Sequence, residues 1–534
     1  MVSKAPQFSI QGDLEVSALS RALPDVVGAI DPEYLRRQRW FGSKGKPISA
    51  LRLKEHAVVQ ATLPFFFLNL IEVEYAGFDT ELYFVPLMIS NQALPRNDLL
   101  LQVQSTSAIG FVYEALGDDE FCKALLQRIE RPGQLRATNG DFVFDKTPAF
   151  FASEGLTIKR SRAEQSNTSI IFGDALILKA FRKVEMGINP DLEICNFLTT
   201  RTTFPHIPRV AGSIEYQSSH SRAAIGILQH FIRNEGDAWD YKLRHLQRFY
   251  ASAAQAGEKD TAVVDPEALE GPTGRLLREY AADADRLGHT TGQLHLALAS
   301  DRHDPSFAPE PITRQDATEW VASIKQHIEG VLEAIHRNVS SYDPELQKTM
   351  ADVLRKKPAY LKKIEDLQEL GDVKISKIRC HGDYHLGQVL KTEECFCILD
   401  FEGEPIRSLE RRRHKTSPLK DVAGMLRSYS YAAHAGLRAL DPAGEHQRAY
   451  LESWAHTWER MASRSFLAGY LDETRRAQAD FVPASHDLLH RILSVFVLDK
   501  AIYELGYELS HRPTWVSLPL EGLQAAMLGG RDVD

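Results

Sequence analysis

Short apolar runs that alternate with polar residues dominate the first 110 residues of the chain. Residues 48–53, 66–75 and 80–86 are rich in Val, Phe and Tyr, and this pattern with a period of two is typical of β-strands. Ahead of them, Asp31 and Pro32 fit the start of a helix, because proline suits the first helical position. We therefore expect residues 1–110 to form a mixed α/β cap subdomain.

The next segment, residues 111–232, has the pattern of a small β-rich lobe with a connecting segment. A polar turn at 163–168 separates two apolar runs, and Pro190 with its acidic neighbours fits the start of a helix. The strands predicted here are 156–158, 169–172, 176–181 and 223–231.

Beyond residue 240 the apolar positions recur with helical spacing. The predicted helices cover 243–254, 273–298, 318–335, 344–370, 419–433, 447–469 and 488–509. An island of strand pattern between residues 375 and 401 interrupts them. A β-rich small lobe followed by a helical lobe with an inserted hairpin is typical of two-lobed kinases. We therefore predict an α+β, two-lobed protein-kinase-like fold, with residues 233–534 as the large lobe and the hairpin at 375–405.

Composition narrows the possible functions. The net charge of -9 argues against broad binding to nucleic acid or to anionic membranes. No basic segment followed by an apolar core begins the chain, and the apolar stretch at 64–71 is far shorter than the roughly 20 residues that span a bilayer. Five scattered cysteines are typical of reduced thiols in the cytosol. We expect a soluble cytoplasmic protein that binds neither nucleic acid nor a membrane.

The strand island carries the residues most typical of chemistry. His381-Gly382-Asp383 follows an apolar strand, and Asp400 ends a later one. Phosphoryl transfer needs one carboxylate to accept or orient the attacking hydroxyl, and a second, with an amide partner, to hold Mg²⁺ on the phosphates. Asp383 fits the first role, and Asp400 with Gln388 fits the second. The spacing Asp383-x4-Gln388 matches that of a kinase catalytic loop.

Other interpretations of these residues are less consistent with the pattern. His381 and His385 are spaced like a metal-binding pair, but Gly382 and the hairpin context argue against the helix that such a pair needs. Asp400 taken alone is also compatible with a turn or cap residue. The complete order of loop, amide, strand and Asp-Phe favours a kinase-type site.

These motifs resemble the bacterial maltokinases, which belong with the aminoglycoside-phosphotransferase-like kinases. Gln388 stands where the wider kinase pattern has Asn, as it does in maltokinases, while Tyr384 departs from the usual Leu. The similar stretches are spread over nearly the whole chain and are 38–45, 381–390, 399–405, 418–428, 500–508 and 512–515.

The resemblance implies an enzyme that uses ATP and Mg²⁺, with Asp383 as catalytic base and Gln388 and Asp400 as Mg²⁺ ligands. Maltokinases phosphorylate maltose at its anomeric hydroxyl and so supply maltose 1-phosphate for the synthesis of α-glucan (glycogen-like) polymers from trehalose and maltose. They are often fused to or complexed with trehalose synthase. The expected partners are therefore maltose, ATP and trehalose synthase.

The nucleotide-binding side of the site is expected in the small lobe. Lys179, at the end of a strand, fits the lysine that contacts the α- and β-phosphates of the nucleotide. Glu193 on the following helix fits its ion-pair partner, and Glu185 is a competing candidate. The alternative is a solvated lysine and a surface glutamate.

No Gly-rich G-x-G-x-x-G loop is present. The turn at 164–169 is expected to cover the phosphates with backbone N–H groups and with the hydroxyls of Ser166, Thr168 or Ser169. Gln229 and Phe231 mark the expected adenine-binding linker. Residues 42–47 do not form a P-loop, because their spacing is short and proline replaces Ser/Thr.

The sugar acceptor is expected in an acidic or aromatic pocket of the large lobe. Sugar rings stack on aromatic faces, although each aromatic residue taken singly is also compatible with a core position. The candidate substrate residues are His385, Glu402, Tyr431, Tyr503 and Trp515.

Some further polar residues have supporting or structural interpretations. Asp421, at the start of a helix, is expected to brace the catalytic loop. The run at 411–413 is expected to be a solvated loop in preference to a phosphate clamp. His289 and His295 lie on a helical pattern and are expected to be packed or surface residues rather than ligands.

Two rivals to maltose phosphorylation are left open. One is a kinase of the same fold that acts on glucosamine or glucose, because the pattern does not identify the pocket. The other is a non-catalytic subunit that partners trehalose synthase. The intact set of Lys179, Asp383, Gln388 and Asp400 argues against this second rival.

Overall fold

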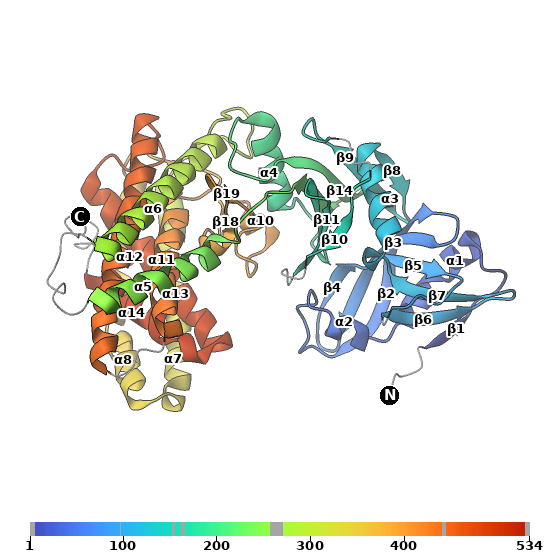
Figure 1. Cartoon of the computed structure of the whole chain (residues 1–534), viewed down its shortest axis with the longest axis horizontal. Helices are drawn as coiled ribbons and strands as arrows, with labels where there is room; N and C mark the ends of the chain where they lie inside the picture. The colour runs from blue at the N-terminus through green and yellow to red at the C-terminus, as the bar shows by residue number, and fades with distance from the viewer. Residues whose placement is uncertain are drawn as a thin grey trace. The chain divides into compact units, whose positions relative to one another are not determined.

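The computed structural model describes residues 6–96, 98–151, 155–161, 166–256, 271–440 and 445–528 (Figure 1). The chain divides into two compact units. One contains residues 1–201 and 208–233, and the other contains residues 202–207 and 234–534. The first unit holds the cap and the small lobe, and the second is the helical large lobe. The domain boundaries at residues 110 and 232 stay predictions, and β7 (Ile109–Glu114) runs across the first of them.

The cap is built on a sheet with the strand order β1-β6-β7-β5-β3-β4-β13, in which β2 also pairs with β3. The strands predicted at 48–53, 66–75 and 80–86 fall in β2, β3 and β4 and are confirmed. The helix α1 (Val16–Gly28) buries Leu19, Leu23 and Val26, which recur at helical spacing, in a core shared with Phe67 of β3. The remaining elements of the cap are α2 (Glu33–Arg37), β1 (Gln7–Ser9), β2 (Ile48–Gln60), β3 (Phe65–Tyr75), β4 (Phe78–Phe84), β5 (Leu87–Ser90), β6 (Leu99–Gln104) and β13 (Lys183–Val184).

The small lobe is a second sheet with the order β10-β11-β12-β15-β14-β9-β8. Its core is continuous with that of the cap, because Phe121 of α3 (Asp119–Glu130) packs edge-to-face on Phe66 of β3, with ring centroids 5.4 Å apart. The other elements are β8 (Gly133–Arg136), β9 (Gly140–Lys146), β10 (Ile158–Arg160), β11 (Asn167–Phe172), β12 (Leu176–Phe181), β14 (Val210–Ser218), β15 (Arg222–His230) and α4 (Pro190–Arg201).

A buried arginine ties the cap to the small lobe. Arg182 directly follows β12, and its guanidinium lies 3.0 Å from the carboxylate of Glu114 and 4.3 Å above the ring of Trp40. It also donates a hydrogen bond of 3.2 Å to the carbonyl of Phe84. Residues 42–47 lead into β2 and open no helix, which agrees with the rejection of a P-loop there.

The large lobe is mainly helical, with α6 and α12 packed along each other (Figure 1). The predicted helices are confirmed except for the one at 344–370, which was wrong as a single element. The first of its pieces ends at Arg355, and the next begins at Lys357, where Pro358 lacks the N–H that a continuous helix needs. The helices are α5 (Ala238–Ala256), α6 (Gly271–Leu298), α7 (Arg314–Asn338), α8 (Pro344–Arg355), α9 (Lys357–Ile364), α10 (Leu409–Arg412), α11 (Leu419–Leu440), α12 (Glu445–Arg476), α13 (His486–His511) and α14 (Ser517–Leu528).

The strands predicted between residues 375 and 401 are present in the structure, but they are short. The strand β18 (Val389–Lys391) pairs with β19 (Phe396–Ile398) as an antiparallel hairpin, and β17 (Ser376–Lys377) pairs with β16 (Glu310–Pro311). A single 3-10 turn, η6 (Leu386–Gln388), leads into β18. The open end of the hairpin, where β18 begins and β19 ends, therefore lies next to the loop that carries Asp383.

Within the described part of the chain, no helix combines the length and apolar character needed to cross a bilayer. All five cysteines lie in that part and are free thiols, as the composition predicted.

Candidate active site

The loop at 381–385 places Asp383 against a second loop from the hairpin. Gly382 has a φ of 87°, a left-handed conformation that favours glycine. A Cβ atom at Gly382 would lie only 3.3 Å from the Cα of Gly403. The two loops approach so closely because both positions lack a side chain.

Asp421, at the start of α11, fixes the backbone of this loop by hydrogen bonds. Its carboxylate accepts hydrogen bonds from the backbone N–H groups of His381 at 2.8 Å and of Gly382 at 3.0 Å. The buried ring of His295 from α6 lies 3.0 Å from the same carboxylate. Burial raises the pKa of Asp421, but the hydrogen bond and charge of His295 outweigh it, so the pKa lies below its usual value. The prediction that Asp421 braces the loop is confirmed, and so is the packed position of His295.

Asp383 forms an ion pair that the sequence pattern did not reveal. The Nζ atom of Lys500 on α13 lies 3.0 Å from Oδ1 of Asp383, and the two side chains are 17% and 19% exposed. Burial raises the pKa of Asp383, but the ammonium of Lys500 outweighs it, so the carboxyl has a pKa below its usual value. Asp383 is therefore held ionised, as a proton acceptor must be.

Lys500 is itself fixed by its surroundings. Its ammonium lies 4.7 Å from the centre of the Tyr503 ring, one turn further along α13. The stretch 500–508 resembles maltokinases, but the local sequence pattern does not predict a partner for Lys500.

His385 and η6 connect the loop to the hairpin. The Nδ1 atom of His385 accepts a hydrogen bond of 3.1 Å from the N–H of Gly387, and Nε2 lies 3.9 Å from the carboxylate of Asp383. The N–H of Leu399 donates to the carbonyl of Gln388 at 2.9 Å. Gln388, which precedes β18, therefore lies beside Leu399 at the end of β19, and Asp400 is the next residue of the chain.

Asp400 occupies an unusual backbone conformation. Its φ of 63° lies in the left-handed region, which a non-glycine residue adopts at a cost of about 1–3 kcal/mol. The ring of His381 stabilises this turn, because it lies 4.9 Å from the Phe401 ring and 2.8 Å from the carbonyl of Leu399. Such strain is concentrated at functional positions in proteins.

The hairpin end offers oxygen ligands that suit Mg²⁺. A carboxylate oxygen of Asp400 lies within 4.8 Å of one of Glu402, and the amide of Gln388 belongs to the same end of the hairpin. Carboxylate and amide oxygens are the ligands that Mg²⁺ prefers, and a cation relieves the repulsion between neighbouring carboxylates. Glu402, predicted as a substrate residue, therefore also fits a place beside the metal.

On the small lobe, Lys179 forms an ion pair with a neighbour of the predicted partner. Its Nζ atom lies 3.2 Å from the carboxylate of Asp191 in the first turn of α4, and both side chains are buried. The sequence pattern predicted no role for Asp191, which lies two residues before Glu193. The role of Glu193 stays a prediction.

The other residues predicted for the nucleotide lie on the same sheet as Lys179. Thr168 on β11 pairs with Ala180 of β12, and Gln229 on β15 pairs with Ile177 of β12. Ser166 immediately precedes β11. Phe231 donates its N–H to the carbonyl of Ala175 at 2.8 Å. Residues 162–165, which include the first two residues of the turn predicted at 164–169, lie outside the described residues. Residues 167–169 belong to β11 rather than to a turn, which corrects that part of the prediction.

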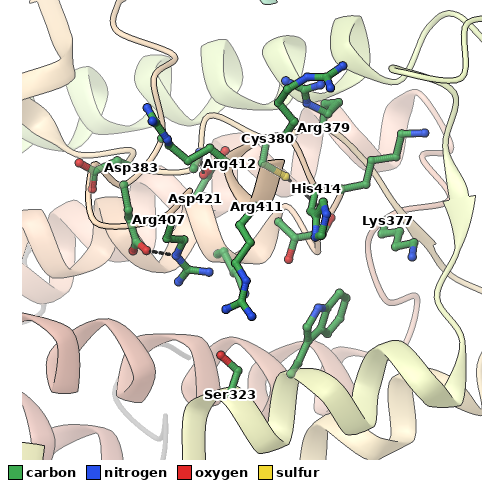
Figure 2. Close-up of a pocket in the computed structure, with 18 of the residues that line it drawn as sticks. Ser323, Lys377, Arg379, Cys380, Asp383, Arg407, Arg411, Arg412, His414 and Asp421 are labelled. Carbon is green, nitrogen blue, oxygen red and sulfur yellow. Dashed lines mark hydrogen bonds and ion pairs between the residues drawn. The ribbon is translucent and has the colours of Figure 1, made fainter. Parts of the chain in front are cut away.

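A cavity of about 890 Å³ in the large lobe opens beside Asp383 (Figure 2). Figure 2 shows Asp383 at one end, Lys377 at the other, and the side chains of Arg407 and Arg411 reaching into the space between them. The run at 411–413 lines this cavity, a position that the solvated-loop interpretation did not predict.

Of the predicted substrate residues, Tyr503 lines this cavity, whereas His385, Glu402, Tyr431 and Trp515 are not among its lining residues. The hydroxyl of Tyr431 lies 3.4 Å from Glu508, and the Trp515 ring packs against arginine side chains. Part of the wall consists of residues on α7, α11 and α13 for which the sequence pattern predicted no role. These are Trp320, Ser323, His327, Lys420, Phe496 and Asp499.

Known proteins show two kinds of similarity to the chain. Residues 34–118 match the family model of the maltokinase N-terminal cap domain. The glucosamine kinase of Streptacidiphilus jiangxiensis is 23% identical over 363 residues, which cover 67% of this chain and 70% of that protein. The glucosamine kinase of Mycolicibacterium smegmatis (strain ATCC 700084 / mc(2)155) is 24% identical over 370 residues, which cover 68% and 78%.

Solved structures extend the similarity to nearly the whole chain. A glucosamine kinase in complex with glucosamine, ADP and inorganic phosphate superposes with a TM-score of 0.64 at 18% identity, covering 94% of this chain and 98% of that one. A second crystal form of glucosamine kinase has a TM-score of 0.66 at 18% identity, covering 95% and 99%. The chain therefore has the two-lobed kinase-like α+β fold, with a β-sheet N-terminal lobe, a helical C-terminal lobe and an N-terminal cap domain.

Proposed function

We propose that the chain is an ATP-dependent sugar kinase that phosphorylates maltose at its anomeric hydroxyl and releases maltose 1-phosphate. The observation that carries the proposal is the ionised Asp383, held by Lys500 and by the loop that Asp421 braces, at the end of a cavity of about 890 Å³. The match of residues 34–118 to the maltokinase cap supports the choice of maltose.

In this mechanism Asp383 accepts the proton of the sugar hydroxyl while the hydroxyl oxygen forms its bond to the γ-phosphorus and the bond to the leaving ADP oxygen breaks. Lys179, oriented by Asp191, is proposed to contact the α- and β-phosphates. Gln388 and Asp400 would hold Mg²⁺, which neutralises charge on the phosphate oxygens when it is bound. Catalysis then depends mainly on the positioning of Asp383.

The second candidate acceptor is glucosamine. It is favoured by the named relatives, which match about two thirds of the chain, although at only 23–24% identity. Both candidates use the same machinery and differ in the group that occupies the cavity.

A panel of sugars tests the proposal directly. Maltose, glucose and glucosamine are incubated with MgATP, ADP release is followed, and the phosphorylated position is located by NMR. We expect turnover with maltose and a phosphate on its anomeric carbon. ADP release with none of the sugars, in a protein that MgATP still stabilises against heat, would refute the proposed activity.

Lys500→Met should move the acidic limb of the kcat/KM profile to higher pH. Lys500 keeps the pKa of Asp383 low against the opposing effect of burial, and His385 and His381 are the other ionisable groups facing the carboxyl. Without the ammonium the pKa of Asp383 rises, so the base is protonated, and activity is lost, at a higher pH as the solution is acidified.

The measurement is the pH dependence of kcat/KM for both proteins. Lys500→Arg keeps the positive charge and should restore most of the activity at low pH. Lys377→Met is the matched control, because its ammonium pairs with Asp316 at 2.6 Å in the same cavity. An acidic limb that stays in place in Lys500→Met would contradict the role assigned to Lys500.

A further inference from the structure

We infer that α7, α11 and α13 build an acceptor subsite in the cavity beside Asp383, in which Lys420 and Asp499 bind the hydroxyls of an uncharged sugar. The inference rests on the proposed function and extends it to the residues that select the acceptor. Lys420 and Asp499 line the same cavity as Asp383 and Lys500, and Figure 2 shows Asp383 in this cavity.

Lys420 offers hydrogen-bond donors to this cavity. Its ammonium lies 5.7 Å from the centre of the Trp320 ring and 5.6 Å from that of Phe496, so α7 and α13 hold it from two directions. Among the described residues, no ion pair and no hydrogen bond to its Nζ atom is found, and the charge of Asp499 acts on it without direct contact. The side chain of Lys420 is half-buried, and its three N–H groups suit oxygen atoms of a ligand.

Asp499 offers the complementary acceptors. Its Oδ1 atom lies 3.4 Å from Nδ1 of His327, a long contact that uses little of the capacity of a carboxylate. Burial raises the pKa of Asp499, but His327 and Lys420 outweigh it and keep the pKa low. Each sugar hydroxyl both donates and accepts a hydrogen bond. An ammonium and a carboxylate on one wall are thus matched to the neighbouring hydroxyls of a sugar ring.

The charges around this subsite disfavour an acceptor that carries an ammonium group. Asp383 is paired with Lys500, and Glu404 is paired with Arg407. Asp499 is hydrogen-bonded to His327, and the positive charge of Lys420 acts on it. An aminosugar would have to displace one of these cations or lie beside Lys420, whereas a hydroxyl meets no such repulsion.

The other carboxylates of the cavity do not change this conclusion. Glu310, Glu319 and Glu410 are exposed, where solvent and salt weaken their attraction for a cation. Asp316 is paired with Lys377, and Asp421 is occupied by the loop N–H groups and His295. The subsite beside the catalytic base therefore favours glucose-type rings, such as those of maltose, over glucosamine.

The first test compares glucose with glucosamine, which differ only in the hydroxyl or ammonium group on C2. Each is measured as an acceptor, or as a competitive inhibitor against the best acceptor, and also by titration calorimetry. We expect the wild-type chain to bind glucose at least about tenfold more tightly than glucosamine. Tighter binding of glucosamine would overturn the inference.

The second test removes the donor. Lys420→Met keeps the stem that packs on the aromatic rings and should raise KM for the neutral sugar about tenfold, because hydrogen bonds to charged groups are stronger than neutral ones. The KM for ATP should not change. Asp499→Asn, which preserves shape, should raise the sugar KM in the same way, and thermal unfolding verifies that both variants fold. The control is Lys357→Met, which lies outside this cavity and pairs with Glu329 at 3.6 Å, and which should leave the sugar KM unaltered.

An unchanged sugar KM in both folded variants would overturn the inference while leaving the kinase activity in place. If the wild-type chain phosphorylates no sugar at all, the proposed function fails. In that case the calorimetric comparison of the two sugars still decides whether the subsite selects an uncharged ring.

Discussion

Asp383→Asn should lower kcat by about 10²- to 10⁴-fold, the usual contribution of a positioned general base. The asparagine amide keeps the size of the carboxyl but cannot take up the hydroxyl proton. The substitution also removes the anionic partner that lies 3.0 Å from Lys500, so the side chains at position 383 and of Lys500 are less firmly positioned. The measurement is steady-state turnover of the best acceptor with MgATP.

ATP binding separates this effect from misfolding. The nucleotide residues proposed around Lys179 are untouched, so stabilisation of Asp383→Asn by MgATP in a thermal unfolding experiment should equal that of the wild type. Asp487→Asn is the matched control, because this carboxylate is 79% exposed on the helix that also carries Lys500. Turnover within a few fold of wild type in Asp383→Asn would remove Asp383 as the base.

Asp421→Asn is expected to have the second largest effect, a loss of about 10²-fold in kcat, since a misplacement of about 1 Å at a reacting group can have this consequence. The carboxylate of Asp421 receives the N–H groups of His381 and Gly382 and the ring of His295 on its two oxygens. An asparagine has one oxygen and one NH₂ group, so a donor would then face a donor in a buried site. Each unsatisfied group destabilises by about 1–3 kcal/mol.

The test combines kcat with the unfolding temperature of Asp421→Asn, which should fall. A double variant with Asp383→Asn should lose little further activity, because both residues act on the same proton transfer. Ser494→Ala on α13 is a control outside this network, since its hydroxyl bonds only to the carbonyl of Arg491 among the described residues. Full kcat in a folded Asp421→Asn protein would show that the brace is not needed.

Much of the fold could be predicted because its signals are local. The period-two pattern of 66–75 and the helical spacing of 419–433 each depend on neighbours within one element, and both elements formed as expected. The helix predicted at 344–370 was the exception, since a period alone does not reveal where Pro358 starts a new segment. The comparisons with known proteins then bore out the two-lobed fold.

The residues of the candidate site also separate into those that local sequence signals predicted and those that only the packing of distant segments brings together. By itself the sequence determined the loop around Asp383 and the hairpin with Gln388 and Asp400, because turn residues and strand ends follow local rules. The brace from Asp421 was predicted from the resemblance to kinases, since it joins residues about 40 positions apart. Only the tertiary structure decided that Lys500, 117 residues further along, pairs with Asp383. It also decided that Lys179 pairs with Asp191, because the pattern of the strand does not record which residues of α4 lie beside it. The acceptor wall of Lys420 and Asp499 arises only where α7, α11 and α13 pack, and no pattern within one helix records its partners in another.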